Sequence, residues 1–119
     1  MEKSRLFVQE RESPRCEARL FVRNPQGKFE QHLGNLGIGG CFFKTSDFMV
    51  LGQEVVLVLV LQELDLKVKV SGKVIRMNPD RRYMGVAVKF DKLSFETERM
   101  IARWLDLRTR AMDHDSYAA

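Results

Sequence analysis

The stretch "LKVKVSGKVIRM", residues 66–77, alternates apolar and polar side chains and is the clearest sign of the fold. Its first half places three apolar residues on one side of an extended chain and three polar residues on the other: Leu66, Val68 and Val70 against Lys67, Lys69 and Ser71. This period of two is typical of a β-strand with one buried face. The pair Ser71 and Gly72 predicts a bulge or sharp bend, after which the strand continues.

Further strands are expected on both sides of this stretch. Similar runs of β-forming residues occur at 16–23, 28–33, 41–45, 54–61 and 83–90. The run "EVVLVLVL", residues 54–61, is so apolar that we expect both of its faces, or nearly both, to be buried. The segments "NPQG" (24–27) and "NPDRR" (78–82) predict turns, because proline presets the backbone for a turn and glycine, asparagine and aspartate tolerate turn geometry.

The last part of the chain changes to a helical period. In "SFETERMIARWLDLRTR", residues 94–110, four apolar residues recur at helical spacing: Met100, Ile101, Trp104 and Leu105. Ser94 is the expected N-cap, and Glu96 and Glu98 fall in the first turns, where negative charge favours the helix dipole. Short strands followed by one helix indicate an antiparallel barrel or sandwich with a helix packed on it.

The composition limits the classes of function. The chain has 119 residues, a net charge of +4 and 30% charged residues of both signs. This favours one domain and, only mildly, an anionic partner, because a nonspecific nucleic-acid binder is more basic and more clustered. Cys16 and Cys41 have no spacing typical of a disulfide framework or a metal site. Without a signal-peptide core or a bilayer-length apolar run, we expect a cytoplasmic protein that does not insert into membranes.

Two arginines stand close to the N-terminus in "RESPR", residues 11–15. Pro14 fixes its own φ and disfavours helix at Ser13, so the segment should be extended. Arg11 and Arg15 would then project from one side, roughly 13 Å apart. Two guanidinium forks at that separation suit an extended anion such as a dinucleotide. The alternative is that these arginines only form a charged surface.

A second unusual stretch is "GNLGIGGCFF", residues 34–43, with four glycines in seven positions. A strand follows it, so no helix N-terminus is available to receive a phosphate as in a P-loop. Glycine permits positive φ and lets another group approach the backbone closely, here beside Asn35, which offers both a donor and an acceptor. A plain glycine-rich bulge between two strands is the alternative.

Taken together, the order of these parts resembles the PilZ domain family, whose pattern is RxxxR followed about one hairpin later by [D/N]xSxxG. "RESPR" fits the first motif, and Asn35 to Gly40 fits the second except at the serine position, which is Gly37. The resemblance implies an all-β fold, a six-stranded antiparallel β-barrel with a C-terminal α-helix. It implies a single domain at 11–110 after a flexible segment at 1–10. The closing segment 111–119 has little to bury, so we expect it to be frayed.

The resemblance also implies a ligand, the bacterial second messenger cyclic di-GMP. By matching position, Arg11 and Arg15 would clamp its phosphates and guanines, Asn35 would recognise a guanine edge, and Gly37 and Gly40 would form the turn beneath it. Tyr83 is a further candidate, by stacking on a guanine, with ordinary packing as the alternative. Neither a metal nor another cofactor is implied, and no catalytic constellation is evident, so we expect no enzyme.

Two departures from the family pattern leave a second hypothesis open. Gly37 lacks the hydroxyl of the family's serine, a hydrogen bond of about 0.5–1.5 kcal/mol. Glu10 stands directly before the first motif arginine, where many members have another arginine. The chain would thus be either a cyclic di-GMP receptor that orders its arginine segment on the ligand and signals to a partner protein in motility or attachment, or a ligand-free interaction module.

A third hypothesis is a small barrel that binds single-stranded nucleic acid. Such a barrel needs several aromatic platforms beside a basic groove. The exposed aromatic residues expected here, chiefly Phe21, are too few, so no DNA or RNA partner is expected. The sequence leaves the oligomeric state open.

Overall fold

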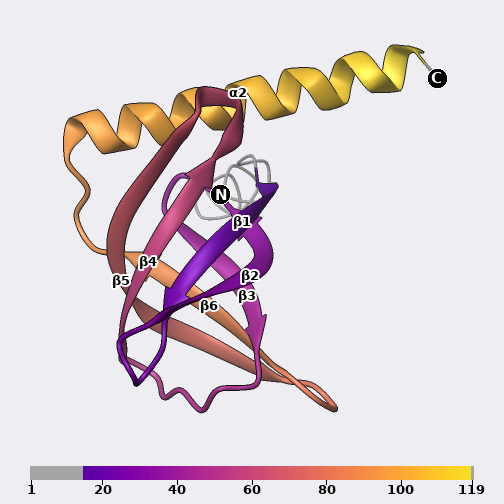
Figure 1. Cartoon of the computed structure of the whole chain (residues 1–119). Helices are drawn as coiled ribbons and strands as arrows, with labels where there is room; N and C mark the ends of the chain where they lie inside the picture. Colours follow the sequence, from indigo (N-terminus) through magenta and orange to yellow (C-terminus); the bar gives the residue numbers. More distant parts are fainter. Residues whose placement is uncertain (1–14, 119) are drawn as a thin grey trace, which may run out of the picture.

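The structure, a computed structural model, describes residues 15–118, with side-chain surroundings given for 15–111. Six antiparallel strands close into a barrel in the order β1-β2-β3-β6-β5-β4, and α2 lies across one end of it (Figure 1). The elements are β1 (Cys16–Arg23), β2 (Phe29–Leu36), β3 (Gly40–Thr45), β4 (Glu54–Leu61), the short 3₁₀-helix η1 (Gln62–Leu64), β5 (Leu66–Pro79), β6 (Met84–Phe90) and α2 (Phe95–Ala118). This confirms the predicted six-stranded barrel with a C-terminal helix and excludes the sandwich.

The apolar strand β4 is buried on one face only. Its inward residues are fully or almost fully buried: Val55, Leu57, Leu59 and Leu61. Its outward residues Val56, Val58 and Val60 are half-buried, so the expectation of burial on both faces is wrong. The outer face of a barrel strand meets solvent. On the neighbouring strand β5, however, Lys69 pairs with Val58 and Lys67 with Val60, and the apolar stems of these lysines can cover part of the valine surface.

The bulge of β5 lies at Ile75, not at Ser71 and Gly72 as predicted. Val74 faces Val88 on β6 and Arg76 faces the next residue, Ala87, which leaves Ile75 as the extra residue. Gly72 serves a different purpose, since a Cβ atom there would collide with the carbonyl oxygen of Lys89. The glycine was therefore a sign of close approach between strands rather than of a bend.

Helix α2 begins where the sequence predicts. The hydroxyl of Ser94 accepts a 3.1 Å hydrogen bond from the amide of Thr97, which confirms the N-cap. Ile101, Trp104 and Leu105 are buried in the core, and Met100 is partly buried against it. Within residues 15–118, no helix is long and apolar enough to cross a membrane.

The end of α2 differs from the expected boundary at Arg110. The helix continues to Ala118, through most of the segment 111–119 that we expected to be frayed. The expected fraying stays a prediction, because helical backbone geometry does not test it. The segment "AMDHDSYA" contains neither glycine nor proline, the two residues that most strongly oppose a helix, so nothing in its sequence ends the helix earlier.

Candidate functional site

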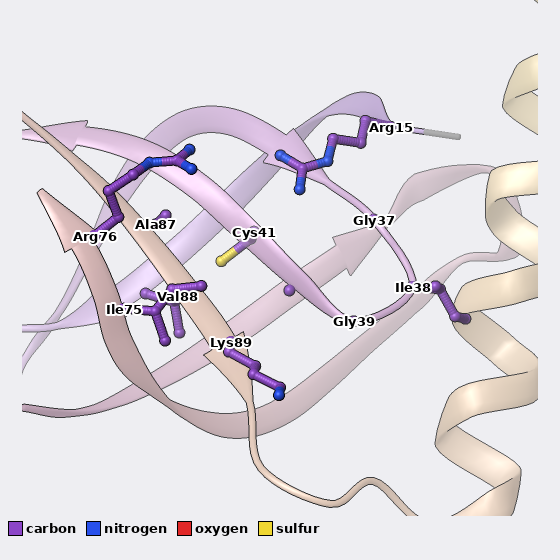
Figure 2. A pocket seen from close by; sticks show the side chains of 11 residues that line it. Arg15, Gly37, Ile38, Gly39, Cys41, Ile75, Arg76, Ala87, Val88 and Lys89 are labelled. Carbon is purple, nitrogen blue, oxygen red and sulfur yellow. The ribbon is translucent and has the colours of Figure 1, made fainter. Parts of the chain in front are cut away.

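A cavity of about 410 Å³ lies between the start of β1, the turn from β2 to β3, the bulge of β5 and the end of β6. We call it the Arg15 cavity. Figure 2 shows Arg15 and Arg76 reaching over it toward one another, with Lys89 on the other side of Cys41 and Val88. Three cations thus surround a largely apolar floor, and none of the described residues that line the cavity is acidic. Such a site suits an anion that also has flat, weakly polar faces.

The glycine-rich turn is held tightly against β6. The amide of Gly37 donates a 2.9 Å hydrogen bond to the carbonyl oxygen of Gly40, and the amide of Phe90 donates one of 2.9 Å to that of Gly39. A Cβ atom on Gly40 would collide with the carbonyl oxygen of Val88. Gly40 is therefore required by the close approach of β6.

Positive φ does not explain these glycines. The described glycines with positive φ are Gly27 and Gly52, both outside the stretch 34–40. Of the two reasons expected for the stretch, close approach is therefore confirmed and positive φ is wrong.

The bulge of β5 determines which side chains face the Arg15 cavity. Without the extra residue, Ile75 and Arg76 would point to opposite faces of the strand. With it, both are exposed on the outer face and both line the cavity. Ile75, at 57% exposure, is an unusually open apolar side chain beside a guanidinium fork. The pair offers a flat ligand an apolar contact and a charged donor at the same edge.

Cys41 contributes a neutral surface to the cavity. Its side chain is 5% exposed, and it is a free cysteine. Burial raises the pKa of the Cys41 thiol to about 12, although the positive charge of Arg15 acts in the opposite direction. The thiol is therefore protonated at neutral pH, and it is a packing surface rather than a nucleophile.

The structure brings together three of the residues predicted for the site. Arg15, Gly37 and Gly40 line the same cavity. Asn35 does not: it lies exposed on β2, opposite Phe42 on β3, which in turn faces Ala87 at the cavity. Two strand spacings separate Asn35 from Ala87, about 10 Å. Arg11 lies outside the described residues.

Tyr83 is placed away from the cavity. It precedes Met84, which pairs with Thr45 and with Pro79 at the far end of β6. Ala87 comes four positions after Tyr83, about 13 Å along a strand. Its carbonyl oxygen accepts a 2.9 Å hydrogen bond from the amide of Asp80, which closes the turn between β5 and β6. The structure therefore gives Tyr83 a role in the turn, and the cavity does not include it.

Six residues of the cavity were missed by sequence reasoning: Cys41, Ile75, Arg76, Ala87, Val88 and Lys89. Lys89 could have been found, because the alternation of "VAVKF" already places it on the outer face of the last strand. Ile75 and Arg76 could not, since their direction depends on the position of the bulge.

Residues 9–107 match the family model of the PilZ domain. The fold is similar to the PilZ domain of YcgR from Escherichia coli with c-di-GMP, at a TM-score of 0.72 and 11% identity over 93% of this chain and 100% of that one. No curated protein matches.

Two further structures are similar over part of their length. The inhibitor of motility MotI/DgrA of Bacillus subtilis has a TM-score of 0.68 at 14% identity, over 87% of this chain and 52% of that one. The MrkH–c-di-GMP complex of K. pneumonia has a TM-score of 0.64 at 18% identity, over 87% of this chain and 54% of that one. The chain thus spans about half the length of MotI and MrkH.

Proposed function

The chain belongs to the PilZ domain family, and from this premise we propose that it is a cytoplasmic receptor for cyclic di-GMP that binds the dinucleotide in the Arg15 cavity. The observation that carries the proposal is the convergence of Arg15, Arg76 and Lys89 on the glycine turn. The chemistry of the ligand fits this arrangement. Cyclic di-GMP has two phosphodiester anions and two guanines, and the O6 and N7 atoms of guanine accept a bidentate arginine fork.

The three cations suit different parts of the ligand. Arg15 and Arg76 can each donate two parallel hydrogen bonds to a phosphate or to a guanine edge. Lys89, a compact charge on a flexible stem, suits a phosphate oxygen. The exposed side chain of Ile75 offers an apolar contact to a guanine plane beside the fork of Arg76. Gly39 and Gly40 line the cavity and have no side chains, which leaves room for a ring to lie close to the backbone of the turn.

Arg11 and Asn35 complete the proposal by their positions in the two motifs. Asn35 would recognise a guanine that extends beyond the cavity along the outer face of β2 and β3. Arg11 would clamp the ligand from the N-terminal segment, which precedes Arg15 in the sequence. Ordering of that segment on the ligand would create a surface for an effector protein, as expected for control of motility or attachment. Two similar structures supply the precedent, since the PilZ domain of YcgR was solved with c-di-GMP and MrkH as a c-di-GMP complex.

A ligand-free interaction module is the second candidate. It is favoured by Gly37, which lacks a hydroxyl at the motif serine, by Glu10 before the motif, and by Asn35, which stands outside the cavity. Binding of single-stranded nucleic acid has less support. Phe21 is half-buried, and the most exposed aromatic residues of the described chain lie in separate segments: Phe48 in the loop between β3 and β4, Tyr83 in the turn before β6, and Phe95 at the start of α2.

Calorimetry separates the two main candidates. A receptor gives a saturable heat of binding with cyclic di-GMP at physiological salt and none with GMP at the same concentration. Arg15→Ala should remove most of this binding, and Arg23→Ala, an exposed arginine at the other end of β1, is the matched control. A flat titration at millimolar ligand would defeat the receptor proposal. A partner recovered equally with and without the nucleotide would then establish the interaction module.

A further inference from the structure

Arg108 on α2 connects three elements of the molecule. Its Nη1 donates a 3.1 Å hydrogen bond to Oε2 of Glu63 in η1. Its Nη2 donates one of 3.3 Å to the backbone carbonyl oxygen of Glu17 in β1. The guanidinium also lies over the ring of Trp104, 5.6 Å from the ring centroid. We call Arg108, Glu63, Trp104 and Glu17 the Arg108 clamp.

Trp104 and Arg108 both bond to Glu63 within the Arg108 clamp. Nε1 of Trp104 donates a 2.6 Å hydrogen bond to Oε1 of Glu63, and the indole is 2% exposed. Each carboxylate oxygen of Glu63 therefore has a donor from α2. These contacts alone would fasten the helix to η1, so the additional bond from Arg108 to Glu17 calls for a separate reason.

The bond to Glu17 joins α2 to β1, the strand that directly follows Arg15. Arg15 and Glu17 are two residues apart at the start of β1, so their side chains project from the same outer face of the barrel. The carbonyl of Glu17 is held by the helix, which limits how the backbone immediately after Arg15 can move. Any movement of that backbone must therefore strain or release the bond from Arg108.

The second half of the Arg15 cavity is also joined to α2. The turn is bonded to Phe90 through Gly39, and the next residue, Asp91, is fixed by three groups of β5. Its amide donates to the carbonyl oxygen of Ser71 at 2.9 Å, and its carboxylate accepts from the Ser71 hydroxyl at 3.0 Å and from Lys73 at 3.2 Å. Helix α2 begins four residues later, at Phe95. Helix α2 is thus connected to the cavity in two ways. Its start follows Asp91 and the end of β6 in the chain, and Arg108 bonds it to the start of β1.

We infer that Arg108 is a positioning residue that couples the start of β1, and with it Arg15, to helix α2. This inference rests on the proposed function, because the coupling matters when a ligand engages Arg15. The bond to Glu17 holds the strand in the orientation that directs Arg15 into the cavity. By linkage, a ligand that changes this orientation changes the docking of α2 to the same extent.

A lysine variant separates this role from a purely structural one. Arg108→Lys keeps a positive charge beside Glu63, but a single ammonium on a flexible stem does not reproduce a fork that bridges Glu63 and Glu17. Arg103→Lys is the matched control: Arg103 lies on the same helix, is exposed, and is outside the clamp. Arg103→Lys should keep the thermal stability of the parent within about 3 °C, because small surface changes shift stability little, whereas Arg108→Lys changes a half-buried network and is compared with this control.

Amide hydrogen exchange tests the coupling without any ligand. We expect Arg108→Lys to speed exchange at the described amides of Cys16, Glu17 and Ala18 by about fivefold or more, while Arg103→Lys leaves them unchanged. Equal exchange at these amides in the parent and in Arg108→Lys would overturn the inference. This arm does not depend on whether the proposed ligand is the right one.

Calorimetry and fluorescence test the coupling with cyclic di-GMP. Arg108→Lys should weaken binding by about fivefold with Arg103→Lys unchanged, and saturating ligand should alter the emission of Trp104, the only tryptophan of the chain. Parent-like affinity in Arg108→Lys, or binding without any change in Trp104 emission, would overturn the inference. A parent protein that fails to bind defeats the proposed function instead, and the exchange result then decides the role of Arg108 by itself.

Discussion

The amide of Phe90 donates a 2.9 Å hydrogen bond to the carbonyl oxygen of Gly39, which fastens the turn between β2 and β3 to the end of β6. The same approach brings the carbonyl oxygen of Val88 against Gly40. The turn that forms one wall of the Arg15 cavity is therefore fixed by β6 and does not have to be shaped by the ligand. Preorganisation of this kind lowers the entropic cost of binding.

Adjacent glycines provide a direct test of this wall. Gly40→Ala adds a Cβ atom where β6 leaves no room, so it should destabilise the fold by about 1–3 kcal/mol and weaken ligand binding. Gly39→Ala is the matched control for stability, since a Cβ atom there meets nothing within 4 Å. Urea unfolding measures the stability of both variants, and calorimetry measures ligand binding by Gly40→Ala against the parent. If Gly40→Ala is as stable as Gly39→Ala and binds like the parent, the close approach of β6 does not shape this wall.

The three cations of the cavity should contribute separately to affinity. A hydrogen bond to a charged group is worth about 1.5–3 kcal/mol, so Arg76→Ala should weaken cyclic di-GMP binding by about tenfold to a hundredfold. Lys89→Ala should have a smaller effect of the same sign, because an ammonium makes no bidentate contact. Arg81→Ala, an exposed arginine in the turn between β5 and β6, is the control and should bind like the parent. Parent-like affinity in both Arg76→Ala and Lys89→Ala would show that the ligand lies elsewhere.

Restoring the motif serine should strengthen the site. Gly37→Ser supplies a hydroxyl at a position that lines the cavity, and one added hydrogen bond is worth about 0.5–1.5 kcal/mol. We expect binding to tighten by up to about tenfold in calorimetry. A variant that folds like the parent but binds more weakly would mean that this glycine is an adaptation rather than a loss.

Acid should weaken the docking of α2 through Glu63. Although partial burial opposes ionisation, hydrogen bonds from its own backbone amide, Arg108 and Trp104 lower the pKa of the Glu63 carboxyl below its ordinary value of 4.5. A lowered folded-state pKa means that the unfolded chain binds a proton first as the pH falls. Ionised Glu63 thus stabilises the fold above about pH 4.5, and this contribution is lost as the pH falls through the lowered pKa.

The measurement for this prediction is urea unfolding followed by Trp104 emission at pH 7 and at pH 3. Glu63→Gln should be less stable than the parent at pH 7 and close to it at pH 3. A stability difference of the same size at both values would show that the charge of Glu63 does not hold the helix.

Much of the fold follows from local patterns. The alternation in β5, the "NPQG" turn and the helical spacing around Trp104 are each determined by a few neighbouring residues, and all three are confirmed. The bulge at Ile75 could not be predicted from neighbouring residues, because it depends on the register between β5 and β6. The burial of β4 was overestimated for a related reason: its apolar outer residues are covered only in part, by neighbours on β5.

The same distinction between local and long-range features applies to the candidate site. The two motifs predicted Arg15, Gly37 and Gly40, which are close in sequence to the turn and to the start of β1. Arg76 and Lys89 come from two strands that reach the cavity only through the closure of the barrel. Tyr83 was predicted from its aromatic ring and its place beside a predicted strand, and its position just before the start of β6 keeps it out of the cavity.

The most direct test of the account is the mapping of amide chemical shifts in the ¹⁵N-labelled protein during titration with cyclic di-GMP. We expect saturable shifts concentrated at Gly39, Gly40, Arg76 and Lys89, with the amides of Phe48 and Tyr83 unchanged. Addition of GMP at the same concentration should produce no comparable pattern. An unchanged spectrum at millimolar cyclic di-GMP, or shifts confined to residues outside the Arg15 cavity, would contradict the claim that this cavity is the binding site.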